Sequence, residues 1–315
     1  MFEVTYRCNF HCKHCYVPDS YRNYGELDTK EIFAILDRLK EIGCFYLGFT
    51  GGEPFMRADF PEILSYAKQC GFTIIIYTNG SLIDQEKARQ LADLNPNKVD
   101  ITIPAMSTKA FEAVSGVPGS RDKVFQAIEL LHKNDVALGF KSCLLKENES
   151  EISHIQDFAR GLSCLHRLDD QLSPRLDGCQ EPYEYRGRLP SQEAEGPDCQ
   201  AADTAGAAGL FSCGVGATQA AITPLGELKM CIMIDRYKYK VTPPAGSLQQ
   251  AWERLKADVS SIEPDQSYQC PDCRLNPYCK WCPAKSWLYN RTFTSCVPHL
   301  RDWAKKKDLA YTAIP

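Results

Sequence analysis

The stretch Cys8-Asn9-Phe10-His11-Cys12-Lys13-His14-Cys15 decides how the rest of the chain is interpreted. It places three cysteines in a C-x3-C-x2-C spacing directly after the apolar residues 2–6, which we expect to form a strand. Cysteine thiolates hold [4Fe–4S] clusters, and three closely spaced ones leave one iron free for a ligand that is not protein. The alternative is a zinc site that takes its fourth ligand from His11 or His14.

A second motif, Gly51-Gly52-Glu53-Pro54, follows the apolar run 45–50. Glycines let a backbone approach a ligand closely, and Glu53 supplies a hydrogen-bond acceptor beside them. Alone, these four residues are typical of an ordinary turn. Their place after a three-cysteine loop makes the motif more specific.

Together the two motifs resemble those of the radical S-adenosylmethionine (SAM) superfamily. The resemblance implies that Cys8, Cys12 and Cys15 bind a [4Fe–4S] cluster whose open iron is chelated by SAM. It also implies that the loop 51–54 binds the amino group of SAM. The ring of His14 is then expected to pack near the adenine.

The composition limits the kinds of partner. The chain has 315 residues, with 40 Asp and Glu, 36 Lys and Arg, and a net charge of −4. This balance argues against nucleic acid as a partner, and no apolar stretch is long enough to cross a membrane. The chain starts Met1-Phe2-Glu3 without the features of a signal peptide. Its sixteen cysteines therefore indicate metal ligation in a reducing compartment, and we expect a cytoplasmic protein.

Apolar runs alternate with helical patterns through the first half of the chain, which indicates βα units and a parallel sheet. The expected strands are 2–6, 45–49, 73–78, 99–103, 136–144 and 165–169, and the expected helices are 28–42, 60–69, 84–94, 121–133 and 149–161. Six such repeats predict an α/β fold, a partial (β/α)6 TIM-type barrel that is open on one side. Active sites of these barrels lie at the carboxyl ends of the strands.

Residues at the other strand ends are further candidates for binding SAM. Thr78 and Asn79 end the third strand, and Thr102 lies where the superfamily usually has a serine. Lys141 points, by alternation, either into the barrel or toward its outer helices. The alternatives are a satisfied turn for Asn79 and a packed strand residue for Thr102.

A second group of cysteines fills the last third of the chain and resembles the SPASM domain, a cysteine-rich extension that holds two auxiliary [4Fe–4S] clusters. It differs from that family in having two residues rather than three between its fifth and sixth cysteines. The group consists of Cys213, Cys231, Cys270, Cys273, Cys279, Cys282 and Cys296.

The resemblance implies how these cysteines divide between two clusters. The first set is Cys213, Cys231 and Cys282 with a fourth ligand from Cys199 or Cys179, or with an open iron position. The second set is Cys270, Cys273, Cys279 and Cys296. The alternative is a zinc ribbon formed by the two C-x2-C pairs, Cys270 with Cys273 and Cys279 with Cys282. We assign no function to Cys44, Cys70, Cys143 or Cys164.

These features predict four parts of the chain. Residues 1–172 form the radical SAM partial barrel, and residues 173–209 lack periodicity and form a linker or insertion. Residues 210–299 form the SPASM auxiliary-cluster domain, and residues 300–315 form a C-terminal helix or tail.

The resemblance implies an enzyme that cleaves SAM reductively to a 5′-deoxyadenosyl radical, which takes a hydrogen atom from the substrate. Auxiliary clusters suit a net oxidation, because they accept the electron released as the substrate radical forms a new bond. Most SPASM enzymes install crosslinks, thioethers or carbon–carbon bonds in ribosomally made peptides. We therefore expect a peptide maturase that receives electrons from a flavodoxin- or ferredoxin-type reductant. No catalytic acid or base is assigned.

Two details of the sequence refine this expectation. Sulfatase-maturing relatives place an aspartate directly after the second SPASM cysteine, whereas Ile232 follows Cys231 here and Asp235 is four positions on. This difference argues against formylglycine formation. Seven residues precede Cys8, so we expect a separate leader-recognition protein, a longer natural chain or a substrate without a leader.

Two alternative functions remain open at this point. The chain could act on a small-molecule cofactor precursor of the porphyrin or quinone type. It could also be an iron–sulfur electron carrier without SAM chemistry. The loop 51–54 argues against the carrier, which has no need to bind SAM.

Overall fold

The computed structural model describes residues 1–188, 210–242 and 247–312. Strands and helices alternate through its first half. The strands are β1 (Phe2–Thr5), β2 (Tyr46–Gly51), β3 (Thr73–Thr78), β4 (Lys98–Thr102), β5 (Leu138–Cys143) and β6 (Leu165–Asp169). The helices are α1 (Thr29–Glu41), α2 (Phe60–Gln69), α3 (Gln85–Leu94), α4 (Thr108–Ser115), α5 (Ser120–Lys133) and α6 (Ile152–Gly161).

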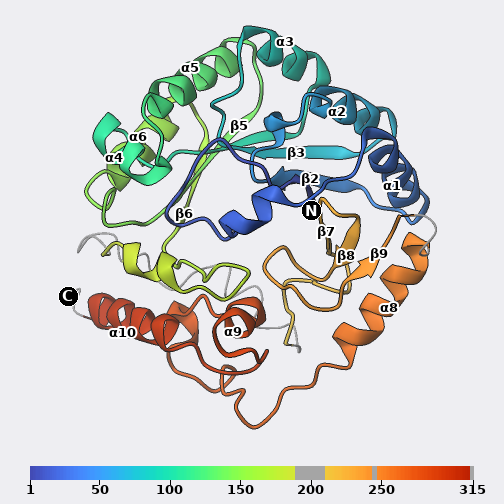
Figure 1. Cartoon of the computed structure of the whole chain (residues 1–315). Coiled ribbons are helices and arrows are strands. Elements are labelled where there is room, and N and C mark those ends of the chain that lie inside the picture. Colours follow the sequence, from blue (N-terminus) through green and yellow to red (C-terminus); the bar gives the residue numbers. More distant parts are fainter. Residues whose placement is uncertain (189–209, 243–246, 313–315) are drawn as a thin grey trace.

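The six strands pair in parallel in the order β6-β5-β4-β3-β2-β1. Figure 1 shows the helices of this half forming an outer arc around the curved sheet. The fold is therefore the expected partial (β/α)6 barrel. Because all six strands run the same way, their carboxyl ends meet at one edge, where both sequence motifs lie.

Local signals explain the bounds of these elements. The predicted ranges of α2, β3 and β6 agree with the structure. Helix α1 begins after Asp28, whose side chain accepts a hydrogen bond from the Glu31 backbone in a capping box. The strand expected at 136–144 is shorter in the structure, where β5 begins at Leu138 and ends at Cys143. The preceding connection contains Asp135, which has a positive φ of 55°. Helix α4 was not predicted.

The main core lies between the sheet and the helices. Phe2, Phe49, Ile74, Ile76 and Ile101 are at most 1% exposed and pack against the apolar faces of the helices. These residues alternate along their strands with less buried or more polar ones, such as Glu3, Ile75 and Asp100, because successive side chains point to opposite faces of the sheet. The opposite face of the strands is left to line the barrel interior.

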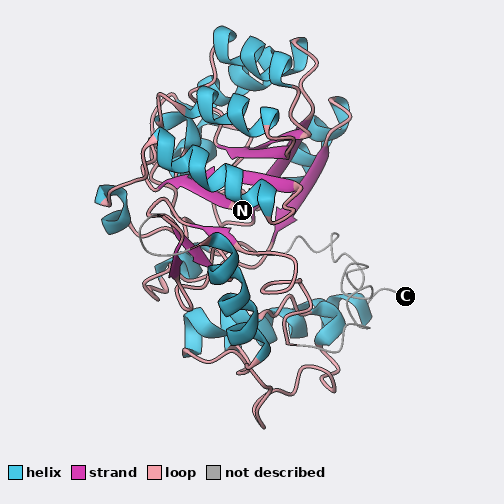
Figure 2. Ribbon diagram, turned by 90° about the vertical axis from the view of Figure 1, so that its right-hand side faces the viewer, coloured by secondary structure: helices cyan, strands magenta, loops and turns pink. Residues whose placement is uncertain are grey.

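The C-terminal part extends the sheet beyond β1 and contains little regular structure (Figure 2). Its short strands β7 (Ala221–Ile222), β8 (Glu227–Lys229) and β9 (Tyr239–Lys240) continue the order as β1-β7-β8-β9. Its helices are α8 (Leu248–Ser260), α9 (Pro283–Asn290) and α10 (Pro298–Thr312). In Figure 1 these elements lie on the side of the barrel that the first six strands leave open.

Four short 3-10 helices complete the described elements: η1 (Asp19–Asn23), η2 (Pro54–Met56), η3 (Glu181–Tyr185) and η4 (Asn276–Tyr278). Helix η3 lies within the range predicted as a linker or insertion, and the Tyr183 ring contacts His299 of α10 at 4.5 Å between centroids. Residues 189–209 lie outside the described part of the chain. Within the described residues, no helix is both long enough and apolar enough to span a membrane.

Candidate functional site

The cysteine loop leaves the end of β1 and is supported by helix α4. The backbone N–H groups of His11 and Lys13 donate to the carbonyls of Ser115 and Val114 at 2.8 and 3.2 Å. The Cys15 N–H donates to the Cys12 carbonyl at 3.0 Å and closes a turn within the loop. The unpredicted helix therefore has a clear role, because its last turn holds the loop in place.

The structure brings the three half-buried thiols of the loop together. Burial raises the pKa of Cys8 to about 11 and that of Cys12 well above its usual range, and the neighbouring thiols add to both shifts. The pKa of Cys15 is raised by burial as well. Thiols of this kind lose their protons when a cation neutralises the charge.

This donor set fits the [4Fe–4S] cluster that the sequence predicts. Cys8, Cys12 and Cys15 are three neighbouring soft sulfur ligands, which is the ligand type that iron–sulfur clusters take. Among the described residues, no three His, Cys, Asp or Glu side chains are arranged as a site for a single metal ion. That these three cysteines hold a cluster stays a prediction.

The glycine loop is pressed against the backbone that leads into Cys8. A Cβ at Gly51 would lie 2.1 Å from the Thr5 carbonyl oxygen, and one at Gly52 would lie 2.2 Å from that of Arg7. Gly51 also has a φ of 146°, which side-chain-bearing residues rarely adopt. Both glycines are required for this close approach. The Gly52 N–H donates a hydrogen bond to the Thr5 carbonyl at 2.7 Å, which holds the loop against β1.

The carboxylate of Glu53 joins the end of β2 to the end of β3. It accepts hydrogen bonds from the Phe55 N–H at 3.1 Å, the Thr78 hydroxyl at 2.7 Å and the Asn79 N–H at 2.7 Å. Burial raises the pKa of Glu53 to about 7, although these hydrogen bonds act in the opposite direction. The chain itself therefore uses most of the acceptor capacity of Glu53, and its contact with SAM stays a prediction.

The two candidates at the end of β3 are also engaged with the protein. The Thr78 hydroxyl is buried and accepts from the Gly80 N–H at 2.9 Å besides its bond to Glu53. The Asn79 side chain donates to the Asn9 side chain at 2.9 Å and lies 4.0 Å from the Cys8 sulfur. Asn79 thus connects the β3 end with the cysteine loop.

The remaining candidates for SAM binding line the barrel interior. Thr102 and Lys141 are paired in register, and the Lys141 ammonium lies 4.9 Å from the centre of the Tyr77 ring. Burial lowers the pKa of Lys141. Burial also lowers the pKa of His14, and the nearby Lys141 charge adds to this shift, which takes the pKa of His14 to about 4. The His14 ring is therefore neutral at physiological pH, and its buried Nδ1 has no hydrogen-bond partner.

Cys143, to which the sequence assigned no function, also faces the barrel interior. It lies on β5 two residues beyond Lys141, and its charge would raise the pKa of Cys12. Burial and the nearby Asp169 carboxylate raise the pKa of Cys143 to about 12. A strand-end cysteine gives no sequence signal by which its position beside the loop could have been recognised.

The structure brings together the first predicted set of SPASM cysteines. Burial raises the pKa of Cys231 to about 11, and the nearby Cys282 and Cys213 thiols contribute to the shift. Cys231 lies in the turn after β8, and Cys282 caps the N-terminus of α9. Cys179 is exposed and donates its N–H to Asp177, and Cys199 lies outside the described residues.

The second predicted set is also brought together. Burial raises the pKa of Cys270 to about 12, and the thiols that contribute are Cys279, Cys296 and Cys273. Cys296 therefore takes the place that Cys282 would have in a zinc ribbon. That these two sets hold two auxiliary clusters stays a prediction.

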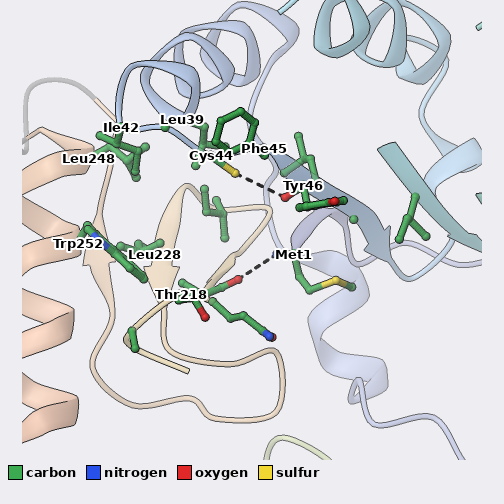
Figure 3. A pocket seen from close by; sticks show the side chains of 18 of the residues that line it. Met1, Leu39, Ile42, Cys44, Phe45, Tyr46, Thr218, Leu228, Leu248 and Trp252 are labelled. Atoms are coloured by element: carbon green, nitrogen blue, oxygen red, sulfur yellow. Dashed lines mark hydrogen bonds between the residues drawn. The ribbon is translucent and has the colours of Figure 1, made fainter. Parts of the chain in front are cut away.

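A large cavity of about 740 Å³ lies at the opposite end of the barrel strands. It is lined by Met1, by Phe45 and Tyr46 at the start of β2, and by Trp252 of α8 (Figure 3). Neither the cysteine loop nor the loop 51–54 contributes to it. The cavity is therefore separate from the candidate site.

Comparison with known proteins identifies the family. Residues 2–159 match the model of the radical SAM superfamily, so the chain belongs to that superfamily. It is 34% identical to an AdoMet-dependent heme synthase of Oleidesulfovibrio alaskensis over 148 residues, which are 47% of this chain and 38% of the relative. It is 25% identical to the mycofactocin maturase MftC of Mycobacterium tuberculosis over 302 residues, covering 89% of this chain and 76% of the maturase.

A solved structure shares the fold. Streptococcus suis SuiB bound to its precursor peptide SuiA superposes with a TM-score of 0.67 and 15% identity, over 93% of this chain and 73% of SuiB. The partial barrel and the C-terminal cysteine-rich part are thus both included in the similarity. The match to the heme synthase, in contrast, spans well under half of that relative's length.

Proposed function

We propose that the chain is a radical SAM enzyme that oxidatively modifies a ribosomally made peptide by forming a crosslink, thioether or carbon–carbon bond. One observation carries the choice of a peptide. The similarity to the maturase covers 89% of the chain, whereas the similarity to the heme synthase covers 47%. The similarity to a maturase therefore extends well beyond the length of chain that resembles the heme synthase.

The residues of the cysteine loop and its neighbours would prepare the site. Cys8, Cys12 and Cys15 would hold the cluster, and the backbone of loop 51–54 would bind the amino group of SAM. When bound, these cofactors supply the reductive cleavage of SAM that generates a 5′-deoxyadenosyl radical. The neutral ring of His14 presents a flat face suited to the adenine, and burial around the loop excludes water.

The strand-end residues would orient the cofactor. Glu53 fixes the loop 51–54 to the end of β3 through Thr78 and Asn79. Thr102 and Lys141 lie side by side on neighbouring strands, with a hydroxyl and an ammonium available to the polar groups of SAM. The Lys141 ammonium lies 4.9 Å from the centre of the Tyr77 ring, and its donors would be available to SAM.

The two sets of C-terminal cysteines support an oxidative reaction. Cys213, Cys231 and Cys282 would hold a first auxiliary [4Fe–4S] cluster, with Cys199 or Cys179 as fourth ligand or with one open iron position. A second auxiliary cluster would be held by Cys270, Cys273, Cys279 and Cys296. Both sets lie in the part of the chain beside the open side of the barrel, where they can accept an electron from a substrate (Figure 1).

The proposal includes two further partners. A flavodoxin- or ferredoxin-type protein would supply electrons. A separate leader-recognition protein would present the peptide. The residue after Cys231 is Ile232 rather than an aspartate, which supports a product other than formylglycine.

Incubation with SAM, a reductant and a peptide encoded beside the gene tests the function. Under anaerobic conditions we expect the peptide to become about 2 Da lighter for each bond formed, because an oxidative bond removes two hydrogen atoms. Mass spectrometry checks the shift, and a hydrazine reagent should add nothing, because the product carries no aldehyde. The variant Cys8→Ala/Cys12→Ala/Cys15→Ala is the inactive control. An unmodified peptide together with turnover of a porphyrin or quinone precursor would contradict the peptide assignment.

A further inference from the structure

A fully buried ion pair connects the first strand of the barrel with the C-terminal strands. The Lys229 ammonium lies 3.1 Å from Glu3 Oε2, and their side chains are 1% and 0% exposed. Glu3 lies on β1 and Lys229 ends β8, with β7 between them in the sheet. Phe2 and Val4 belong to the core under the helices, so Glu3 projects from the opposite face of β1.

The pair continues on both sides toward a cysteine. The Tyr16 hydroxyl donates to Glu3 Oε1 at 3.0 Å, and Tyr16 directly follows Cys15. The Lys229 ammonium donates to the Ile232 carbonyl at 3.0 Å, and Ile232 directly follows Cys231. We call the four residues Tyr16, Glu3, Lys229 and Ile232 the relay.

The far end of the relay holds a tight turn. The Ile234 N–H donates to the Cys231 carbonyl at 3.2 Å, and the two residues form an isolated antiparallel bridge. The Ile232 carbonyl projects from this turn and receives the Lys229 hydrogen bond. A charged donor on a carbonyl makes one of the stronger hydrogen bonds of a protein, so it fixes the orientation of the turn.

A buried ion pair contributes little to net stability, because apolar residues of similar volume would serve as well. Here the ion pair of Glu3 and Lys229 fixes the position of the Ile232 carbonyl. The Lys229 ammonium donates to Ile232, and the Glu3 carboxylate accepts from Tyr16. Glu3 Oε2 has no hydrogen-bond partner among the described residues, so the two groups are joined by the attraction of their charges, which connects the position of Tyr16 with that of Ile232. A pair of apolar side chains could not hold the carbonyl.

We propose that the relay positions the Cys231 turn relative to the SAM-cluster loop, and that its four residues are positioning residues for the first auxiliary cluster. This inference rests on the proposed role of Cys231 as a cluster ligand. Outer contacts of this kind orient the ligands of a metal site and tune its properties, and their loss typically lowers metal affinity or activity by about 10- to 100-fold. The relay would thus keep the two clusters at a fixed separation.

Hydrogen exchange in the protein without clusters tests the relay independently of catalysis. Lys229→Met removes the donor to Ile232, and we expect the amides of the turn 231–234 to exchange at least about tenfold faster. Tyr16→Phe changes only the distant end of the relay and should also speed exchange in this turn. Wild-type exchange in Tyr16→Phe would overturn the proposal, because a Lys229 that acts alone does not respond to Tyr16.

Lys307→Met is the matched control. Lys307 is a buried lysine of α10 whose ammonium lies 2.5 Å from Asp170, so this second ion pair also joins the barrel to the C-terminal part. Neither partner neighbours a SPASM cysteine in the sequence. Exchange in the turn 231–234 should stay at the wild-type rate in this variant, and equal acceleration there would contradict the relay.

The double variant Glu3→Gln/Lys229→Met separates positioning from stability. The double variant leaves no unpaired buried charge, so its melting temperature should be closer to the wild-type value than that of Lys229→Met alone. The turn should still exchange fast, because the Ile232 carbonyl has lost its donor. Recovery of both properties together would show that the pair only stabilises the fold.

Reconstituted protein supplies a second measurement. The reduction potential and electron paramagnetic resonance signal of the first auxiliary cluster should change in Lys229→Met and be retained in Lys229→Arg, which keeps a donor for Ile232. Unchanged signals in Lys229→Met would overturn the proposal. Wild-type protein without auxiliary iron would instead contradict the proposed function, and the exchange measurement would still decide the relay.

Discussion

Gly52→Ala is expected to destabilise the fold by about 3 kcal/mol and to abolish SAM binding. A Cβ at this position would lie 2.2 Å from the Arg7 carbonyl oxygen and 2.7 Å from that of Tyr6. Both atoms belong to the backbone, so neither can rotate away, and β1 and the loop 51–54 must separate. Because Arg7 precedes Cys8, the separation would also move the first cysteine. Urea unfolding and equilibrium dialysis of SAM measure the two effects.

Gly25→Ala is the control for this substitution. Gly25 has no heavy atom within 4 Å of an added Cβ and no positive φ, so the change should alter the free energy of unfolding by less than about 0.5 kcal/mol. SAM binding should be unchanged. Similar unfolding curves for Gly52→Ala and Gly25→Ala would show that the loop 51–54 does not approach the backbone after β1 this closely.

Replacement of Cys8, Cys12 and Cys15 together by alanine is expected to remove one of three clusters. The wild-type chain should bind about twelve irons after anaerobic reconstitution, and the variant should keep about eight. The remaining irons are expected because the C-terminal cysteines form two separate sets, one around Cys231 and one around Cys270. Iron and zinc analysis by plasma mass spectrometry gives both numbers.

A cysteine control accompanies this measurement. Cys44 and Cys70 lie outside the cysteine sets, Cys44 just before β2 and Cys70 at the end of α2, so Cys44→Ala/Cys70→Ala should retain about twelve irons. Stoichiometric zinc in the wild-type chain would contradict the auxiliary clusters. Loss of all iron in the triple variant would contradict the independence of the three sites.

Periodic elements of this fold could be predicted from the sequence, and irregular ones could not. The run of isoleucines in β3 and the glycine after α2 define their bounds without help from distant residues. Strands β7, β8 and β9 have only two or three residues each, too few for alternation to be recognised. Helix α4 is short, and its role becomes visible only when its last carbonyls are seen to support the cysteine loop.

The candidate site shows the same limit. Close spacing predicted that Cys8, Cys12 and Cys15 lie together. The two C-terminal sets were predicted by the SPASM resemblance, because spacing alone also allowed a zinc ribbon. Spacing could not show that the Glu53 carboxylate is occupied by Thr78 and Asn79, since those contacts arise where two strand ends meet. The pair Glu3 and Lys229 joins residues that are far apart in the sequence and leaves no periodic signal.

Release of 5′-deoxyadenosine shows whether the Cys8 loop holds a cluster that cleaves SAM. Reconstituted wild-type protein with SAM and dithionite, in the absence of substrate, is expected to release 5′-deoxyadenosine slowly under anaerobic conditions, as measured by liquid chromatography with mass detection. The variant Cys8→Ala/Cys12→Ala/Cys15→Ala should release none while retaining its auxiliary iron. Wild-type protein with a full complement of iron that releases no 5′-deoxyadenosine, or a triple variant that releases as much as wild type, would show that the Cys8 loop does not hold such a cluster.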